Sequence, residues 1–212
     1  MKRLTIFIVV AALTLGVGVS AFASGKQVTV TNGTGSNVIP WWPAVFPNGC
    51  RCQMLYDQAK INYAGVINEF ELEKSNAYTC TVTNVKFYLC HTKLSALTTN
   101  FSNNYSGYTP VLVASAANYV VPAQSGFYPI PMTATFTYNN TDNLILEITY
   151  DRISGSACGL RNGGLSAHRC WAQSPTATTG SADAVGYNGR ISFSYYTGVT
   201  PTSLGRVKTL YQ

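Results

Sequence analysis

Residues 81–91 read TVTNVKFYLCH, and apolar and polar side chains alternate along the middle of this stretch. An alternation with a period of two is typical of a β-strand with one buried face. The apolar face would carry Val85, Phe87 and Leu89, and the opposite face would carry Asn84, Lys86 and Tyr88. The stretch therefore predicts a strand that contributes to a core.

Residues 143–151 (NLILEITYD) show the same period with a more apolar composition. One face would be formed by Leu144, Leu146, Ile148 and Tyr150, and the other by Ile145, Glu147, Thr149 and Asp151. Further strands are expected at residues 27–31, 66–74, 109–115, 118–121, 127–132, 133–138 and 190–196. Pro129 and Pro131 place the strand at 127–132 on an edge, because proline cannot donate to a strand ladder.

Only two segments favour helix, namely residues 53–64 and a single turn at 93–101. Three prolines make residues 38–49 an extended loop, and the polar composition of residues 154–189 predicts a long loop. Many short strands separated by turns are typical of a sandwich or jelly roll rather than a βαβ fold. We therefore expect one all-β domain over residues 24–212, a jelly-roll-like antiparallel β-sandwich with one or two short helical turns.

Residues 1–23 have the features of a signal peptide. Lys2 and Arg3 precede an apolar run, which ends in the small-residue cleavage pattern Ala21-Phe22-Ala23. Cleavage would lower the net charge from +6 to +4, since Lys2 and Arg3 are removed. No later run is long and apolar enough to predict a membrane span. The expected location is extracellular, in secreted form or on the cell surface.

Charged residues make up 10% of the chain, well below the usual value of about 25%. Thr, Ser, Asn, Gly and Tyr supply the polar surface instead, and a weakly charged surface is less protected against association. Although the sequence pI is about 9.0, the basic residues are scattered, which argues against nucleic acid as a partner. The expected partners are further copies of the chain, as in a homopolymer, or a cell-surface polysaccharide.

Six cysteines follow the signal peptide, and an even number in an exported chain predicts disulfides. They are Cys50, Cys52, Cys80, Cys90, Cys158 and Cys170. Cys158 and Cys170 flank a glycine-rich segment and are the preferred pair. Cys80 and Cys90 are not expected to pair, because one strand would hold them roughly 33 Å apart. The sequence leaves the remaining pairings open.

An ordered set of segments across residues 27–196 resembles a group of secreted bacterial β-sandwich modules found in extracellular and surface proteins. The segments are VTV…GTG at 28–35, CQMLY at 52–56 with Ala59, Ile61 and Ala64-Gly65, NVKFYLCHTKLSAL at 84–97 with Phe101 and Asn104-Tyr105, FTY at 136–138, NLILEI at 143–148 and RISF at 190–193. The chain departs from the group at Cys90, where glycine is usual, and in the cysteines at 50–52. The resemblance implies a secreted or surface module and carries no catalytic residue.

No catalytic apparatus is predicted, and no cofactor is expected. A nucleophilic hydrolase needs a base, but His91 is expected to be structural and His168 exposed. Glycosidases need paired carboxylates, whereas Glu69, Glu71 and Glu73 alternate along one strand and suggest a solvated face. No metal site is predicted beyond a weak Ca²⁺ candidate at Asp142, in an Asn-rich turn.

Aromatic residues give the strongest functional signal. Trp41 and Trp42 lie between prolines in an expected loop, and Tyr105 and Tyr108 lie in another. Exposed aromatic rings anchor interfaces and stack on sugars, although Trp41 and Trp42 could instead cap the core. The leading hypothesis is a non-catalytic structural or adhesive protein, for example a self-assembling filament or surface-layer subunit. Strand donation by residues 26–31 or 204–212 would be one assembly route. The alternative is a lectin-like carbohydrate-binding module.

Overall fold

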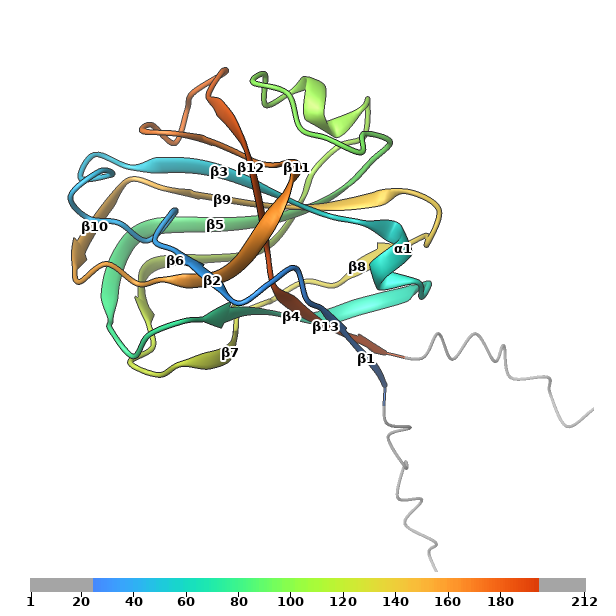
Figure 1. Cartoon of the computed structure of the whole chain (residues 1–212), viewed down its shortest axis with the longest axis horizontal. Helices are drawn as coiled ribbons and strands as arrows, with labels where there is room; N and C mark the ends of the chain where they lie inside the picture. The colour runs from blue at the N-terminus through green and yellow to red at the C-terminus, as the bar shows by residue number, and fades with distance from the viewer. Residues whose placement is uncertain (1–24, 195–212) are drawn as a thin grey trace, which may run out of the picture.

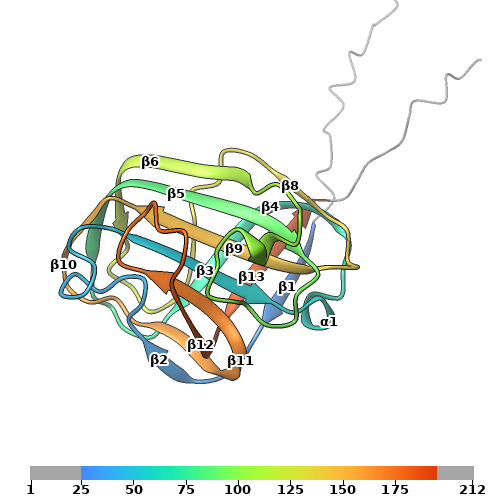
Figure 2. The same ribbon diagram turned by 90° about the horizontal axis from the view of Figure 1, so that it is seen from above.

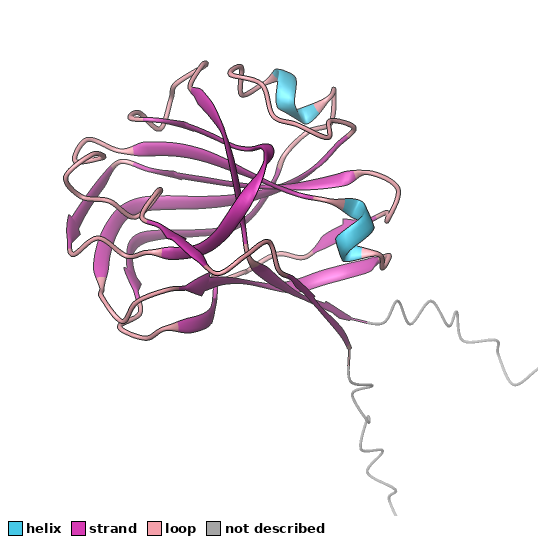
Figure 3. Ribbon diagram, viewed as in Figure 1, coloured by secondary structure: helices cyan, strands magenta, loops and turns pink. Residues whose placement is uncertain are grey.

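The computed structural model describes residues 25–194, and the predicted signal peptide and the segment 204–212 lie outside these residues. The described chain is almost entirely antiparallel β-structure (Figure 3). Its strands are β1 (Lys26–Val30), β2 (Gly35–Asn37), β3 (Cys50–Tyr56), β4 (Gly65–Lys74), β5 (Cys80–Thr92), β6 (Val111–Val121), β7 (Gly126–Pro129), β8 (Phe136–Tyr138), β9 (Asn143–Tyr150), β10 (Arg152–Gly155), β11 (Leu160–Ala172), β12 (Ser181–Tyr187) and β13 (Gly189–Ser194). Two short helical segments complete the fold, α1 (Gln58–Ile61) and the 3₁₀ turn η1 (Asn103–Tyr105).

The strands form one large sheet in the order β1-β13-β4-β11-β3-β9-β5-β10. β6 pairs with β5, β7 and β8 with β4, and β2 and β12 with β11. The link between β4 and β11 is a single residue pair, Lys74 with Leu160. In the view of Figure 1, the ribbons of β3, β5, β6 and β9 lie above those of β4, β7 and β13.

The main core is built from the inward faces of the predicted strands. Leu144, Leu146, Ile148 and Tyr150 of β9 are fully buried, as are Val85, Phe87 and Leu89 of β5. Cys50, Cys52, Met54 and Tyr56 add the inward face of β3. The alternation in residues 81–91 and 143–151 therefore predicted which side chains face the core.

Three secondary-structure predictions are wrong. Of residues 53–64, the first four complete β3, and only residues 58–61 are helical, in α1. Residues 93–101 form no helix, and the short turn follows at η1. The long loop expected at 154–189 contains β11 and β12, which pair with each other at residues 162–164 and 169–171 of β11. The glycines and polar side chains of this segment are typical of a loop, but they belong to strands that are largely half-buried.

The expected pairing of Cys158 with Cys170 is also wrong. Residues 160–172 form strand β11, which separates the two cysteines by roughly 40 Å of extended chain. Disulfides need Cα atoms within about 7 Å of each other. Cys158 lies in the main core, whereas Cys170 lies with Cys90 in a second apolar cluster on the opposite face of the sheet. All six cysteines are buried free thiols.

A candidate binding groove on the outer face of the sheet

A groove crosses the face of the sheet that points away from the main core. Its floor follows the register of three neighbouring strands, in which Lys86 of β5 lies opposite Thr149 of β9, and Thr149 lies opposite Arg51 of β3. One pleat further along, Tyr88 lies opposite Glu147. Successive side chains of a strand point to opposite faces of the sheet, so these residues alternate along each strand with the buried ones. The packed core therefore fixes the floor of the groove.

Two loops and an edge strand form the walls of this groove. The loop around η1 contributes Tyr105 and Pro110, and the loop between β11 and β12 contributes Pro175 and Thr176. Both loops rise above β3 and β9 (Figure 1), and the view from above shows η1 over these strands (Figure 2). β6 supplies Ser115, Ala116 and Ala117. The groove has a volume of ≈ 810 Å³, which is in the range of small-molecule sites.

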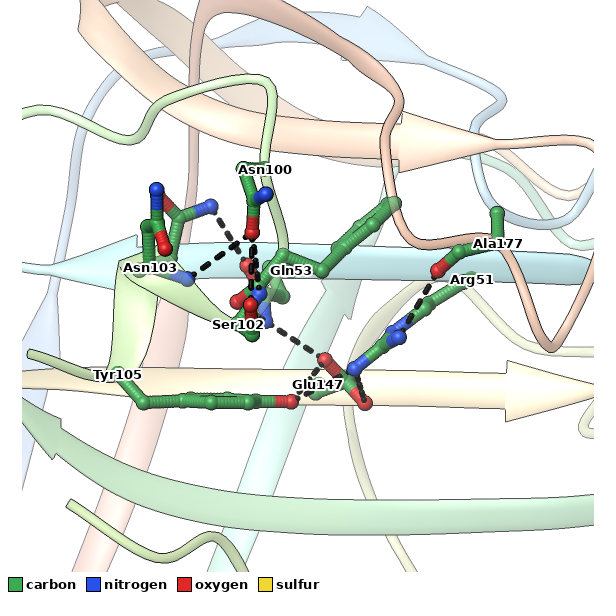
Figure 4. Close-up of polar contacts among 10 residues, drawn as sticks. Arg51, Gln53, Asn100, Ser102, Asn103, Tyr105, Glu147 and Ala177 are labelled. Atoms are coloured by element: carbon green, nitrogen blue, oxygen red, sulfur yellow. Dashed lines mark hydrogen bonds and ion pairs between the residues drawn. The ribbon is translucent and has the colours of Figure 1, made fainter. Parts of the chain in front are cut away.

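Glu147 is the centre of a buried polar network at one end of the groove (Figure 4). Its Oε2 accepts hydrogen bonds from the Tyr105 hydroxyl at 2.6 Å and from Gln53 Nε2 at 2.7 Å. Its Oε1 lies 3.2 Å from an Arg51 guanidinium nitrogen. Only 3% of Glu147 is exposed, and a buried carboxylate needs such partners to offset its desolvation. Arg51, Gln53 and Tyr105 thus fix the position of the Glu147 carboxyl group.

Arg51 connects this network to both loops. One guanidinium nitrogen donates to the Tyr105 hydroxyl and another to the carbonyl oxygen of Ala177, each at 2.9 Å. The guanidinium also lies 4.6 Å from the centre of the Phe101 ring. Although burial opposes the charge, Glu147 and Tyr105 outweigh it and raise the Arg51 pKa. Arg51 therefore stays cationic and fixes the spacing of the two walls.

A second layer of amides holds the η1 loop. Asn104 is fully buried and donates to Gln53 Oε1 at 2.8 Å, while its own Oδ1 accepts from the Thr98 backbone at 2.8 Å. Asn100 Oδ1 accepts from the backbone nitrogens of Ser102 and Asn103 (Figure 4). Because these bonds link the loop to β3, the wall that carries Tyr105 is pre-organised.

The groups that remain open to a ligand are of a different kind. Lys86 and Asp151 are exposed, Tyr88 is half-buried, and Asn84 is exposed and donates to Asp151 at 2.8 Å. Together these residues present an ammonium, a carboxylate, an amide and an aromatic ring to the same groove. Such a surface can exchange hydrogen bonds with hydroxyl groups and can cover an apolar ring face.

The structure separates the four predicted aromatic site residues. Trp41 is fully buried, donates from Nε1 to the Tyr128 hydroxyl at 2.9 Å, and stacks on Tyr150. It belongs to the core, which agrees with the core-capping alternative for Trp41 and not with its interface or sugar-binding role. Trp42 remains 39% exposed but does not line the groove.

The two tyrosines also differ. Tyr105 lines the groove, and its hydroxyl is held by Glu147 and Arg51, with burial as the main cause of its raised pKa. Tyr108 lies outside the groove, where its hydroxyl donates to Asp142 at 2.9 Å. Of the four aromatic candidates, only Tyr105 contributes to the groove.

The histidines and acids considered for chemistry take structural positions. His168 is only 4% exposed, contrary to prediction, and its Nε2 lies 2.9 Å from Asp57. Glu71 is buried and paired with Arg190, which corrects the expected solvated face of Glu69, Glu71 and Glu73.

Asp142, the weak Ca²⁺ candidate, accepts hydrogen bonds from Asn139 and Tyr108. Among residues 25–194, no group of three or more metal-ligating side chains comes together.

Sequence reasoning missed most of the groove residues, although part of the signal was present. The polar face of β5 and the outward face of β9 contain Lys86, Tyr88 and Glu147, and adjacent strands with polar outward positions would have indicated a shared surface. Arg51 was missed because the stretch that follows it suggested a helix.

No protein-family model matches the chain, and no curated protein matches its sequence. Within residues 25–194, we find no helix with the length and apolar character needed to cross a bilayer. The functional argument therefore depends on the geometry of the groove and of the sheet edges.

Proposed function

We propose that the protein is a non-catalytic extracellular adhesive module that binds a carbohydrate in the groove on the outer face of its sheet. The proposal includes a jelly-roll-like sandwich architecture, supported by the single residue pair that joins the β4 and β11 parts of the sheet. The signal-peptide pattern of residues 1–23 supports the extracellular location.

The proposal rests on the presence of two separate sets of residues in the groove, one that holds the walls and one that is open to a ligand. Arg51, Glu147 and Tyr105 bind one another and hold the walls, whereas Lys86, Tyr88 and Asp151 face the open space. The groove contains two basic and two acidic side chains, so its formal charge is balanced. Such a site suits a ligand rich in hydroxyl groups with little net charge, which is the chemistry of a neutral oligosaccharide.

The positions of the two groove acids favour binding over hydrolysis. Glu147 and Asp151 lie four residues apart along an extended segment, which corresponds to roughly 13 Å. Glycosidases place their two carboxyl groups about 5–9.5 Å apart. Glu147 is in addition fully engaged by Arg51, Gln53 and Tyr105. A water-activating pair would need a different arrangement.

Glycan-array screening followed by calorimetry tests this proposal. Lys86→Ala and Tyr88→Ala should each weaken binding of the best glycan by about tenfold or more, a change of about 1.4 kcal/mol. The matched controls are Lys93→Ala, an exposed lysine outside the groove, and Trp42→Ala, an exposed aromatic outside it. Equal binding by the groove variants, or no bound glycan at all, would rule out the proposal.

A second candidate function, self-assembly, is favoured by strand β6. Among the strands of residues 25–194, β6 pairs only with β5, and it carries three exposed apolar residues, Val111, Leu112 and Val120. Backbone nitrogens of Thr133 and Ala134 donate to Val113, so the loop covers one end of this edge. The segment 115–121 has no strand partner on that side within residues 25–194. Long apolar edges of this kind favour pairing between chains.

Strand donation by residues 26–31 has less support, because β1 already pairs with β13 of its own chain. The edge at β6 is tested by Val120→Lys, with Tyr78→Lys as a control at an exposed aromatic residue outside that strand. If chains assemble through β6, only Val120→Lys should abolish the large species seen by electron microscopy and sedimentation. Assemblies that persist in Val120→Lys, or monomers in the wild type at high concentration, would exclude this route.

A further inference from the structure

Two buried cysteines from distant parts of the chain lie side by side in the main core. The sulfur atoms of Cys80 and Cys158 are 3.4 Å apart. Cys80 begins β5, where it pairs with Gly155 of β10. The Ser156 backbone nitrogen donates to the Thr79 carbonyl oxygen at 3.0 Å, which holds the segment before Cys158 against the start of β5. The proximity is therefore fixed by backbone hydrogen bonds.

The other four cysteines have no comparable neighbour in the described chain. Cys50 and Cys52 are two residues apart on the same extended strand, which is unsuitable for a bond between them. Cys90 and Cys170 share the second apolar cluster, but β9 and β3 lie between the strands that carry them. Three strand spacings are about 14 Å. Only Cys80 and Cys158 approach bonding distance.

The surroundings of this pair favour reaction at Cys158. Lys74 is 1% exposed, and its ammonium donates to the carbonyl oxygens of Tyr78 and Pro122 beside the two thiols. The Cys158 pKa is lowered by its hydrogen bond with Cys80 and, against the effect of burial, by Lys74. The Cys80 pKa is raised by the same hydrogen bond and by burial. In the folded surroundings, Cys158 therefore has more thiolate character than Cys80.

We propose that Cys80 and Cys158 form a disulfide when the chain folds in an oxidising compartment. The oxidant is a disulfide carrier, either a protein or a small molecule. The Cys158 thiolate attacks one carrier sulfur and releases the other as a thiolate, and Cys80 then attacks Cys158 Sγ and releases the first carrier sulfur. Two protons and two electrons pass to the carrier, which leaves as two thiols. Both sulfurs are buried in the folded chain, so the exchange accompanies folding.

The bond would join the start of β5 to the segment that leads into β11. These elements are distant in sequence, and in the order of the sheet β9 and β3 lie between β5 and β11. A covalent bond here closes a loop of 77 intervening residues, which restricts the unfolded chain strongly. The remaining four cysteines would stay as buried thiols.

Thiol counting on the exported protein tests this assignment. Alkylation in denaturant without reductant should label four of the six cysteines, and peptide mapping should recover one cross-link between the peptides that contain Cys80 and Cys158. Cys80→Ala and Cys158→Ala should each give five labelled thiols, because the partner is released. Cys90→Ala is the matched control and should give three. Reductant should lower the urea midpoint of the wild type but leave a Cys80→Ala/Cys158→Ala variant unchanged.

Six labelled thiols in the exported wild type would overturn the proposal, as would a cross-link that joins any other two cysteines. The urea midpoint provides an independent check, since reductant should shift the midpoint of the wild type and not that of the double variant. A reductant effect of equal size in the double variant would also contradict the assignment. These readouts do not depend on glycan binding, so they remain informative if the proposed function fails.

Discussion

Replacing Glu147 by glutamine tests whether the buried network holds the groove walls. The change keeps the side-chain volume but removes the charge opposite Arg51, which is 19% exposed at its side chain. Breaking a buried ion pair by neutralising one partner costs about 3–5 kcal/mol. The partial exposure of Arg51 reduces this range, so we expect Glu147→Gln to destabilise the fold by about 2–4 kcal/mol.

Urea denaturation followed by circular dichroism measures this effect, with the slope of the transition expected to stay constant. A loss of about 3 kcal/mol corresponds to a fall in Tm of roughly 6–12 °C for a domain of this size. The control is Asp151→Asn, which removes an exposed carboxylate of the same strand region with one hydrogen bond, to Asn84. This variant should stay within about 0.5 kcal/mol of the wild type.

A double-mutant cycle with Arg51→Met separates the ion pair from general packing. If the two side chains depend on each other, Arg51→Met/Glu147→Gln should be more stable than the sum of the single losses predicts, by about 1 kcal/mol or more. Strict additivity would refute the reasoning. A Glu147→Gln variant as stable as Asp151→Asn would also refute it, since the Glu147 carboxylate would then contribute nothing to the stability of the fold.

Two further predictions concern the core and its pH dependence. Trp41→Ala should lower the free energy of unfolding by about 3–5 kcal/mol, because Trp41 is fully buried. Trp42→Ala should lower it by less than about 1 kcal/mol, because the Trp42 side chain is 39% exposed. Similar urea midpoints for the two variants would contradict the assigned roles. The His91 pKa is lowered by burial, which outweighs Asp142, and His91 Nε2 accepts from the Asn139 backbone in its neutral form. The unfolded chain therefore takes up this proton first as the pH falls below about 6.5, and stability is lost there. His91→Gln should lose less stability than the wild type between about pH 7.5 and 5.5, and an unchanged pH dependence would show that His91 is not responsible.

The sequence predicted strands well where one face is apolar and the other polar. β5 follows this rule, although Asn84 interrupts it with a positive φ of 53°. Val82 and Val85, three residues apart, are both buried as a result. Asparagine tolerates this backbone conformation better than most residues, so the interruption had a visible cause. β9 was also predicted, because its length and its turn residues distinguished it even though residues 144–148 are buried on both faces.

Strands buried on both faces were harder to predict. Gln53, Met54, Leu55 and Tyr56 are consecutive and all buried, since the inner core covers one face of β3 and the η1 loop covers the other. A continuous apolar run does not distinguish a strand from a buried helix. The prediction missed β11 for a different reason, because its glycines and polar residues show no alternation of apolar and polar side chains.

The groove could not be predicted from local pattern because its order comes from long-range contacts. Glu147 meets Tyr105 across 42 residues and Gln53 across 94, and Arg51 reaches the Ala177 carbonyl across 126. The pleat alone puts Arg51 and Glu147 on the outward face of adjacent strands, where water would normally solvate them. The two loops bury them, and that burial turns two exposed charges into a fixed support. The same strands thus serve two purposes, since their inner face forms the core and their outer face positions the groove.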